Sequence, residues 1–470
     1  MLEGLEISEV TYKHVLSSAE TARLDPEYFR KEYLNAEEIV VSRGSDFTSF
    51  KELGLVVDAS AFYPSVEPFY GTGELPFLRV ADVDSIIDFD NGTAIPDEVC
   101  DQFKTLKKVY PGDIVMTKGG SVARIGLVTK PAAACRDLIF VNSSNLAEVD
   151  RLFLYLYLQT SLCYRWLVRS SSQTAQPHLT ITLVRNLPIF IGSESFKEKC
   201  ASLVKEIYHL LDVSKVKYMA AEDMLLSGLG LHDWKPPEPL TYAHKFSDAF
   251  SSNRLDAEFF RPKFDVLEKH IVASNSYSLL GDLMSLNRRG KQPLYVDSGI
   301  TVVNSKHVNR GSVTINSDNR FGLERKGDIV IKYGDVLVNG TGVGTIGRAA
   351  PYLKKYDSLP DNHVTVLRPK KRSIDPVYLS VYLNSLAGKL QVDKWFRGSS
   401  GQIELYPDDL SQFKIWMASD SVQSEIRKNV EEAFSANNLA QERLNIAVTM
   451  VEIAIEESEK DALKYLEEKG

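Results

Sequence analysis

Polar and basic residues stand in two glycine-rich parts of the chain, in patterns that could bind a nucleic acid. Arginine and glutamine can contact base edges through two hydrogen bonds, whereas lysine, serine and threonine commonly hold phosphates. Any one of these residues could equally be a solvated surface residue. The evidence for binding is that the whole group is present twice. The candidates are Lys118, Arg124, Arg169, Ser172, Gln173 and His178 in the first part, and Asn339, Thr341, Arg348, Arg397, Ser399 and Gln402 in the second.

The segments around these residues repeat along the chain. RLDPEYFR at 23–30 recurs as RLDAEFFR at 254–261, with six of eight positions identical. We interpret this octamer as the opening helix of a module, with Asp25 as its cap and Tyr28 and Phe29 packed inward. Further pairs follow in the same order, which predicts a tandem duplication. They are YPGDIVMTKGGSVARIG with YGDVLVNGTGVGTIG, DRLFLYLYLQTS with DPVYLSVYLNS, RWLVRSSSQ with KWFRGSSGQ, and LTITLVRNLPI with LYPDDLSQFKI.

Each copy is followed by a long stretch with apolar residues at helical spacing. The first is expected to open with a capping box from Ser195 to Glu198, and the second to begin near Asp420, with Gln423 three residues on. Two helices that each pack on their own domain would explain the pattern. Their length instead favours pairing with each other as an antiparallel coiled coil.

The predicted fold class is therefore α+β, a duplicated globular α/β domain with a long helix after each copy. Paired prolines in LGLHDWKPPEPL predict a linker after the first helix. Two similar domains held apart by a helical spacer would suit two separated patches of one DNA duplex. The predicted segments are a first domain at 1–190, a spacer helix at 191–230, a linker at 231–240, a second domain at 241–416 and a second spacer helix at 417–470.

Composition and charge exclude few classes of protein. The net charge is −8, but residues 417–470 carry 12 acidic against 6 basic residues, so the rest of the chain is close to neutral and can hold local basic surfaces. We expect no membrane span and no signal peptide, and a cytoplasmic location. Four scattered cysteines predict buried reduced thiols rather than a zinc site.

No complete catalytic motif is recognisable in the sequence. GVGTIG has dinucleotide-type glycine spacing, but Pro351 and Pro360 follow where a helix should begin, so a strand-turn-strand is the better interpretation. The paired acids Asp408 and Asp409 are interpreted as surface or cap residues. Methyltransferase, phosphate-loop and serine-nucleophile motifs are missing. A binding protein without catalytic or metal-binding residues is therefore expected.

With this order of segments, the chain resembles the specificity subunit of a type I restriction-modification system. The resemblance runs from about residue 20 to 465 and is carried by PGDIV and YGDVL with their closing Ile-Gly, by the SSSQ and SSGQ turns followed by LPI and FKI, and by the two long helices. It implies two target-recognition domains, each reading one half of a split DNA site. It also implies a helical pair that sets the gap and recruits two methyltransferase (M) subunits.

The same resemblance implies that restriction and motor (R) subunits join the complex in defence against phage. S-adenosylmethionine, ATP and Mg would then be bound by the partner subunits, with no cofactor in this chain. Two alternatives remain open at this point. One is a DNA methyltransferase or nuclease subunit with unrecognised motifs, and the other is a protein-only scaffold.

Overall fold

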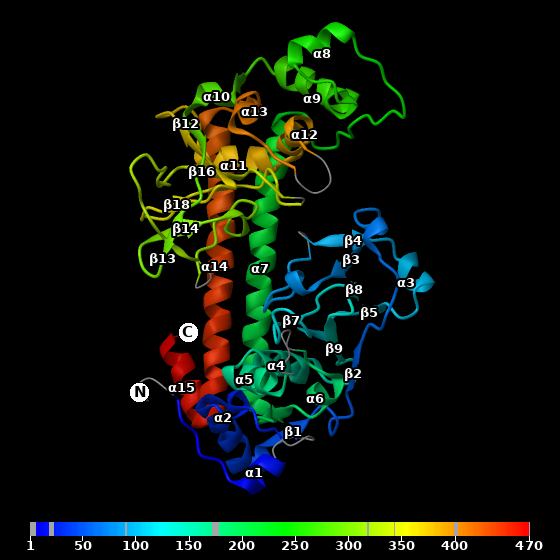
Figure 1. Ribbon diagram of the computed structural model, residues 1–470, viewed down its shortest axis with the longest axis vertical. Coiled ribbons are helices and arrows are strands. Elements are labelled where there is room, and N and C mark those ends of the chain that lie inside the picture. Colours follow the sequence, from blue (N-terminus) through cyan, green and yellow to red (C-terminus); the bar gives the residue numbers. More distant parts are fainter. Residues whose placement is uncertain are drawn as a thin grey trace. The chain divides into compact units, whose positions relative to one another are not determined.

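The computed structural model describes residues 6–17, 23–89, 92–171, 178–316, 319–342, 344–398 and 403–469. The chain divides into two compact units, 1–209 with 439–470 (unit 1) and 210–438 (unit 2). Each unit holds one copy of the repeat together with a part of each long helix (Figure 1). Among the described residues, no helix is long and apolar enough to cross a membrane.

Unit 1 contains two four-stranded sheets and one separate strand pair. The central sheet has the order β2-β9-β6-β7 and is antiparallel, the second has the order β4-β3-β8-β5 with β3 and β8 parallel, and β1 pairs with β10. The strands are β1 (Phe47–Ser49), β2 (Val56–Ala59), β3 (Leu75–Leu78), β4 (Thr93–Ile95), β5 (Lys107–Val109), β6 (Ile114–Thr117), β7 (Ile125–Leu127), β8 (Ala132–Ala134), β9 (Leu138–Asn142) and β10 (Pro188–Phe190).

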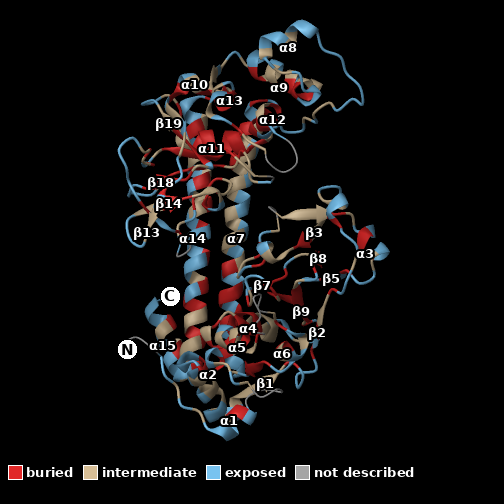
Figure 2. Cartoon of the chain, viewed as in Figure 1, coloured by how far each residue is buried: buried red, intermediate tan, exposed pale blue. Residues whose placement is uncertain are grey.

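The short helices of unit 1 pack around these sheets. Strands β6, β8 and β9 are almost completely buried, as expected of near-continuous apolar runs that are covered on both faces. Figure 2 shows this burial at β9. The helices are α1 (Tyr12–Ser17), the 3-10 turn η1 (Pro26–Phe29), α2 (Lys31–Ser42), α3 (Glu98–Gln102), α4 (Glu148–Leu158), α5 (Ser161–Ser170) and α6 (Ile181–Arg185).

Unit 2 repeats this plan. Its central sheet has the order β12-β19-β16-β17, its second sheet the order β13-β15-β14-β18, and β11 pairs with β20. The strands are β11 (Tyr277–Leu279), β12 (Met284–Arg289), β13 (Leu294–Val296), β14 (Ile300–Val303), β15 (Phe321–Leu323), β16 (Val336–Asn339), β17 (Ala349–Pro351), β18 (Leu359–Pro360), β19 (Val364–Pro369) and β20 (Lys414–Trp416). The helices are α8 (Phe246–Ser252), η5 (Ala257–Phe260), α9 (Pro262–Ala273), α10 (Leu280–Leu283), α11 (Pro376–Asn384), α12 (Leu386–Trp395) and α13 (Pro407–Ser411).

The two central sheets match in register as well as in strand order, which confirms the duplication. Met116 of β6 lies opposite Ile125 and Ile139, and Val338 of β16 lies opposite Ala349 and Thr365. Counting from these positions matches the paired residues of the two sheets up to the irregularity at Ser285, where β12 has one residue without a partner in β19.

The register corrects one detail of the sequence pairing, the closing Ile-Gly. Ile125 is in strand β7, whereas Ile346 lies in the turn before β17, and the register places Ala349 opposite the position of Ile125. The turn is longer in unit 2, 340–348 against 118–124, so the two Ile-Gly pairs do not stand at equivalent positions of the sheets.

Helices α7 (Glu194–Gly228) and α14 (Asp420–Glu456) have 35 and 37 residues. Glu206 pairs with Arg443 at 3.2 Å in unit 1, and Lys217 pairs with Glu432 at 2.6 Å in unit 2. As residue numbers rise along α7 they fall along α14, so the helices pair antiparallel, as predicted. The second helix is not continuous to the end of the chain, because it breaks after Glu456 and α15 (Glu459–Lys469) follows.

The starts of the long helices differ slightly from the prediction. The amide of Phe196 donates to the hydroxyl of Ser193 at 3.4 Å, and the amide of Val422 donates to that of Ser419 at 3.4 Å. The serine before each helix therefore contacts its first turn, and the capping box expected at Ser195 does not form the start. The predicted boundaries of the two globular domains stay predictions.

Candidate nucleic-acid interface

The repeated octamer forms a structural cluster in unit 1. Tyr28 and Phe29 are buried, as predicted. The guanidinium carbon of Arg23 lies 4.7 Å from the ring centre of Tyr28, and that of Arg169 lies 4.2 Å from it. Asp25 stands at the N-cap, as predicted, but the element it precedes is the 3-10 turn η1 rather than an α-helix, and its side chain makes no cap hydrogen bond. Its carboxylate instead accepts two hydrogen bonds from Arg23 at 2.7 and 2.8 Å.

The same cluster recurs in unit 2. Arg254 donates twice to Asp256 at 2.6 Å, and its guanidinium carbon lies 4.8 Å from the ring centre of Phe259. The ammonium of Lys394 lies 5.0 Å from the same ring centre and binds Glu268 at 2.5 Å. The octamer therefore recurs because each unit uses it to build the same packing.

Two of the predicted binding residues belong to the interior. Arg169 is 4% exposed, pairs with Glu37 at 2.7 Å and donates to the carbonyl of Tyr28 at 2.9 Å. Asn339 is fully buried and donates to the carbonyls of Ser305 and Val308 at 3.0 and 3.2 Å. Because a base edge or a phosphate cannot reach such enclosed groups, we assign both residues a structural role and correct the prediction for them.

Three other predicted residues lie together in unit 1, at one edge of its central sheet. The amide of Leu179 donates to the carbonyl of Lys118 at 2.9 Å, and a Cβ placed on Gly119 would lie 2.7 Å from the ring of His178. The exposed Arg124 ends this turn, and its carbonyl accepts from the amide of Thr117 at 2.9 Å. Lys118, Arg124 and His178 therefore lie around a single hairpin turn, and Arg348 ends the matching turn of unit 2.

In unit 2 this edge also holds Thr341 and Arg397. Both form backbone bridges to Glu404, and the hydroxyl of Thr341 lies 3.0 Å from Nδ1 of His363. The amide of Leu405 donates to the carbonyl of Gly340 at 2.9 Å, as Leu179 does to Lys118 in unit 1. The remaining predicted residues, Ser172, Gln173, Ser399 and Gln402, lie outside the described residues.

An open groove of about 640 Å³, here called the arginine groove, runs along this edge of unit 2. Its walls come from β12, from the segment after α12 and from α13. Three of its side chains are arginines, two of which the sequence analysis did not single out. The groove is lined by Asn287, Arg288, Arg289, Arg397, Tyr406, Pro407 and Asp408.

The three arginines of the groove are held differently. Arg289 is enclosed, with Nη1 3.1 Å from Glu404 and Nη2 2.6 Å from the carbonyl of Leu405. Arg397 donates from Nε and Nη2 to the two oxygens of Asp409 at 3.1 and 2.5 Å, and its side chain is 54% exposed. Arg288 is exposed and, among the described residues, has no ion pair.

Asp409 corrects a further prediction. Asp408 is exposed, as a surface residue should be, but Asp409 is only 1% exposed and both of its carboxylate oxygens bind Arg397. This hydrogen bonding raises the pKa of Arg397 above its ordinary value, against the opposing effect of burial. Asp409 is therefore an interior anchor for a surface arginine.

The matched register shows what unit 1 presents at the same place. Asn287 lies opposite Leu367 as Val57 lies opposite Val141, so Arg288 and Arg289 correspond to Asp58 and Ala59. Continuing from the equivalent Leu179 and Leu405, the counterparts of Glu404 and Asp409 are His178 and Leu183. The two units thus share a backbone at this edge and differ in charge there.

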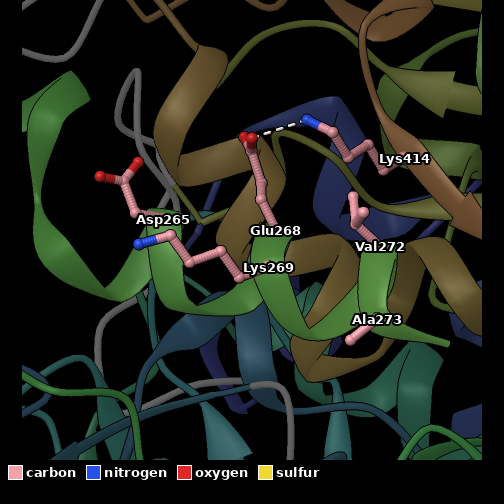
Figure 3. A pocket seen from close by; sticks show the side chains of 6 residues that line it. All are labelled: Asp265, Glu268, Lys269, Val272, Ala273 and Lys414. Atoms are coloured by element: carbon pink, nitrogen blue, oxygen red, sulfur yellow. Dashed lines mark hydrogen bonds and ion pairs between the residues drawn. The ribbon is translucent and has the colours of Figure 1, made fainter.

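A second hollow of about 510 Å³ lies between α9 and β20 in unit 2 (Figure 3). Glu268 points toward Lys414 at 2.6 Å and also binds Lys394 at 2.5 Å. Burial acts to raise the pKa of Glu268, but the two ammonium groups outweigh it and hold that pKa below its ordinary value. Because Glu268, Lys414 and Asp265 are already paired, the last with His244 at 2.9 Å, we assign the hollow a structural role. It is lined by Asp265, Glu268, Lys269, Val272, Ala273 and Lys414.

The structure also bears on three other features of the sequence, which are possible metal ligands, the cysteines and the glycine-rich segment GVGTIG. Among the described residues no three His, Cys, Asp or Glu side chains are grouped to hold a metal ion. The four cysteines are buried and unpaired. GVGTIG lies in the turn between the antiparallel strands β16 and β17, which confirms the strand-turn-strand interpretation.

Comparisons with known proteins give one match in sequence. No family model matches the chain. The specificity subunit of the type I restriction enzyme EcoBI from Escherichia coli is 26% identical over 147 residues, which cover 29% of this chain and 29% of that protein. This relative is of the family that the repeated segments resemble, and it confirms that resemblance.

Two solved structures are similar over most of the chain. The S subunit of a type I restriction-modification system from M. genitalium is 13% identical, with a TM-score of 0.35, and covers 89% of this chain and 95% of that chain. The HsdS subunit from Thermoanaerobacter tengcongensis is 12% identical, with a TM-score of 0.24, and covers 88% and 94%. Because both TM-scores are below 0.5, we draw the function from the sequence match and from the geometry above.

Proposed function

We propose that this chain is a DNA-recognition subunit of a type I restriction-modification complex and reads a split site, one half with each unit. The observation that carries the proposal is the matched register of the two central sheets with different side chains at the same edge. One scaffold used twice, with Asp58 in unit 1 where unit 2 has Arg288, suits a protein that reads two different half-sites.

In this proposal the chain itself is not an enzyme and acts in the cytoplasm, where its DNA is. Two methyltransferase subunits and the restriction and motor subunits would supply catalysis, and with it the binding of S-adenosylmethionine, ATP and Mg. The match to a specificity subunit of a restriction enzyme supports these partners. The paired α7 and α14 would set the gap between the half-sites.

The test uses the full chain assembled with its methyltransferase subunit. We expect two short protected regions on a bipartite duplex, separated by several base pairs, and one continuous footprint would contradict the proposal. Exchange of residues 1–190 for the corresponding domain of a related protein should change one half-site in a map of DNA methylation. A change in both halves would overturn the assignment of one half-site to each unit.

Two further measurements separate the two alternatives. Methyl transfer from S-adenosylmethionine by the isolated chain would support a catalytic subunit instead. A lack of DNA binding even in the assembled complex would support a scaffold that contacts only proteins.

A further inference from the structure

We infer that Arg397, held in place by Asp409, reads a guanine in the half-site bound by unit 2, and that Arg288 beside it binds a backbone phosphate. This inference rests on the proposed function. It goes beyond that function by naming Arg397 as the side chain that specifies a base and Arg288 as the side chain that only attracts the duplex.

The first argument is the geometry of the Arg397 side chain. Nε and Nη2 bind the two oxygens of Asp409, so one edge of the guanidinium is occupied. The other edge, formed by Nη1 and the outer hydrogen of Nη2, stays available on a side chain that is 54% exposed and lines the arginine groove. Two parallel donors on a planar group match the O6 and N7 acceptors of guanine in the major groove.

The second argument is that this arginine is already ordered. A free arginine loses side-chain entropy when it binds, and a side chain fixed beforehand loses less. Asp409 is 1% exposed and its carboxylate is therefore fixed in the protein interior. The guanidinium of an arginine that is anchored in this way has a fixed orientation, and a fixed orientation favours discrimination between bases.

The third argument separates base reading from phosphate binding. Arg397 with Asp409 forms a pair without net charge, which gains little from a phosphate. Arg288 stands between Asn287 and Arg289 in β12, so its side chain leaves the opposite face of the sheet from theirs. It is exposed and has no ion pair in the described part of the chain, so its full charge is open to solvent beside the groove. Neutralising a phosphate releases counterions and makes binding depend on salt, and this role suits Arg288.

Arg289 holds the walls of the groove together, and we assign it no contact with DNA. Besides Glu404 and Leu405, it donates to the carbonyl of Gly340 at 3.3 Å, so it ties β12 to the segment before α13. Its guanidinium carbon lies 5.1 Å from the ring centre of Tyr406, and that of Arg397 lies 5.9 Å from the same centre. Tyr406 therefore lies against both arginines.

Unit 1 does not have this device. Leu183 stands in the place of Asp409 and Asp58 in that of Arg288, so unit 1 has neither the buried anchor nor the exposed cation. The guanine is therefore expected in one half-site only.

The test maps methylation by the complete complex with a double variant, Arg397→Ala with Asp409→Leu. Removing Arg397 alone would leave a buried carboxylate unpaired and risk unfolding. Leucine is the residue that unit 1 has at the corresponding position. We expect the wild-type complex to require a G·C pair at one position of the second half-site. In the double variant discrimination at that position should fall roughly ten- to a hundredfold, with the first half-site unchanged.

The matched variant is Arg288→Gln, measured by binding at several salt concentrations. We expect weaker binding to every sequence, the same recognition motif, and a salt slope reduced by about 1. Lys371→Gln is the control, because Lys371 follows β19 at its far end from Thr365, which pairs with Arg289, and it should change neither the motif nor the slope.

The outcomes distinguish this inference from the proposed function. If the wild-type complex methylates no bipartite site, the proposed function is wrong. If the wild-type complex methylates a bipartite site and the double variant methylates the same site with both halves unchanged, only the assignment of Arg397 is wrong. Loss of a base preference in Arg288→Gln would overturn the assignment of Arg288 to phosphate.

Discussion

Arg169 lies over the ring of Tyr28, with its guanidinium carbon 4.2 Å from the ring centre, and Lys394 takes the same place over Phe259 in the other copy of the repeat. In both units a cation from the second helix after the central sheet, α5 or α12, lies over an aromatic ring of the opening octamer. The octamer is therefore a packing element.

This relationship predicts the effect of removing the cation. Arg169→Ala should lower the stability of unit 1 by about 2 kcal/mol, because it removes the ion pair with Glu37, the hydrogen bond to the carbonyl of Tyr28 and the contact with the Tyr28 ring. The shift in thermal unfolding temperature measures this loss. Arg169→Lys is the control and should keep most of the stability, since a lysine serves in unit 2. A normal unfolding temperature with an altered half-site would show that Arg169 reads DNA after all.

The second prediction concerns pH and the ion pairs of Glu268. Its pKa is lowered in the folded protein from an ordinary value of 4.5, so its contribution to stability is present above pH 4.5 and is lost as the pH falls through the folded pKa. Glu268→Gln should therefore unfold at a lower temperature than the wild type at pH 7, and the difference should shrink below pH 4.5. Glu324→Gln, at an exposed position, serves as the control. A difference that is the same at pH 7 and pH 3.5 would contradict the assignment.

The third prediction concerns the thiols. Burial raises the pKa of Cys135 to about 11 and also raises that of Cys100, Cys163 and Cys200. Because the thiolate is the reactive form, a thiol reagent at pH 8 should label none of the four quickly in the native protein and all four after denaturation. One rapidly labelled cysteine in the native protein would show that its site opens.

The fourth prediction tests whether the matched edge of unit 1 also faces DNA. Asp58 stands where unit 2 has Arg288, and its carboxylate accepts a hydrogen bond from the amide of Ala59 at 2.8 Å. Asp58→Asn should change the methylation motif in the first half-site and leave the second half-site as it is. An effect on the second half-site, or on neither, would place the contact surface of unit 1 elsewhere.

The duplication, the α+β class and the paired helices could be predicted from the sequence. They depend on patterns of apolar residues that are visible within continuous stretches of the chain. The ends of elements were less accurate, as at Ser193, because neighbouring polar residues compete for one cap. The closing Ile-Gly was mismatched because a turn two residues longer moved the same letters out of register.

The candidate site was harder to predict. Arg169 and Asn339 have the right chemistry, but nothing in the nearby sequence shows that their side chains are enclosed. Arg288 escaped notice because β12 lies outside the repeated blocks, and its place in the groove depends on pairing with the distant β19. Asp409 was read as a surface acid because its partner, Arg397, is brought near only by the fold.

The matched register of the two central sheets has a practical consequence. Because a residue of β2 and its counterpart in β12 stand on equivalent backbone, a side chain transplanted between them keeps its direction. Under the proposed function, new pairs of half-sites could therefore be made by exchanging a few side chains between the two sheets instead of whole domains. The unequal turns, 118–124 and 340–348, mark where such an exchange must stop.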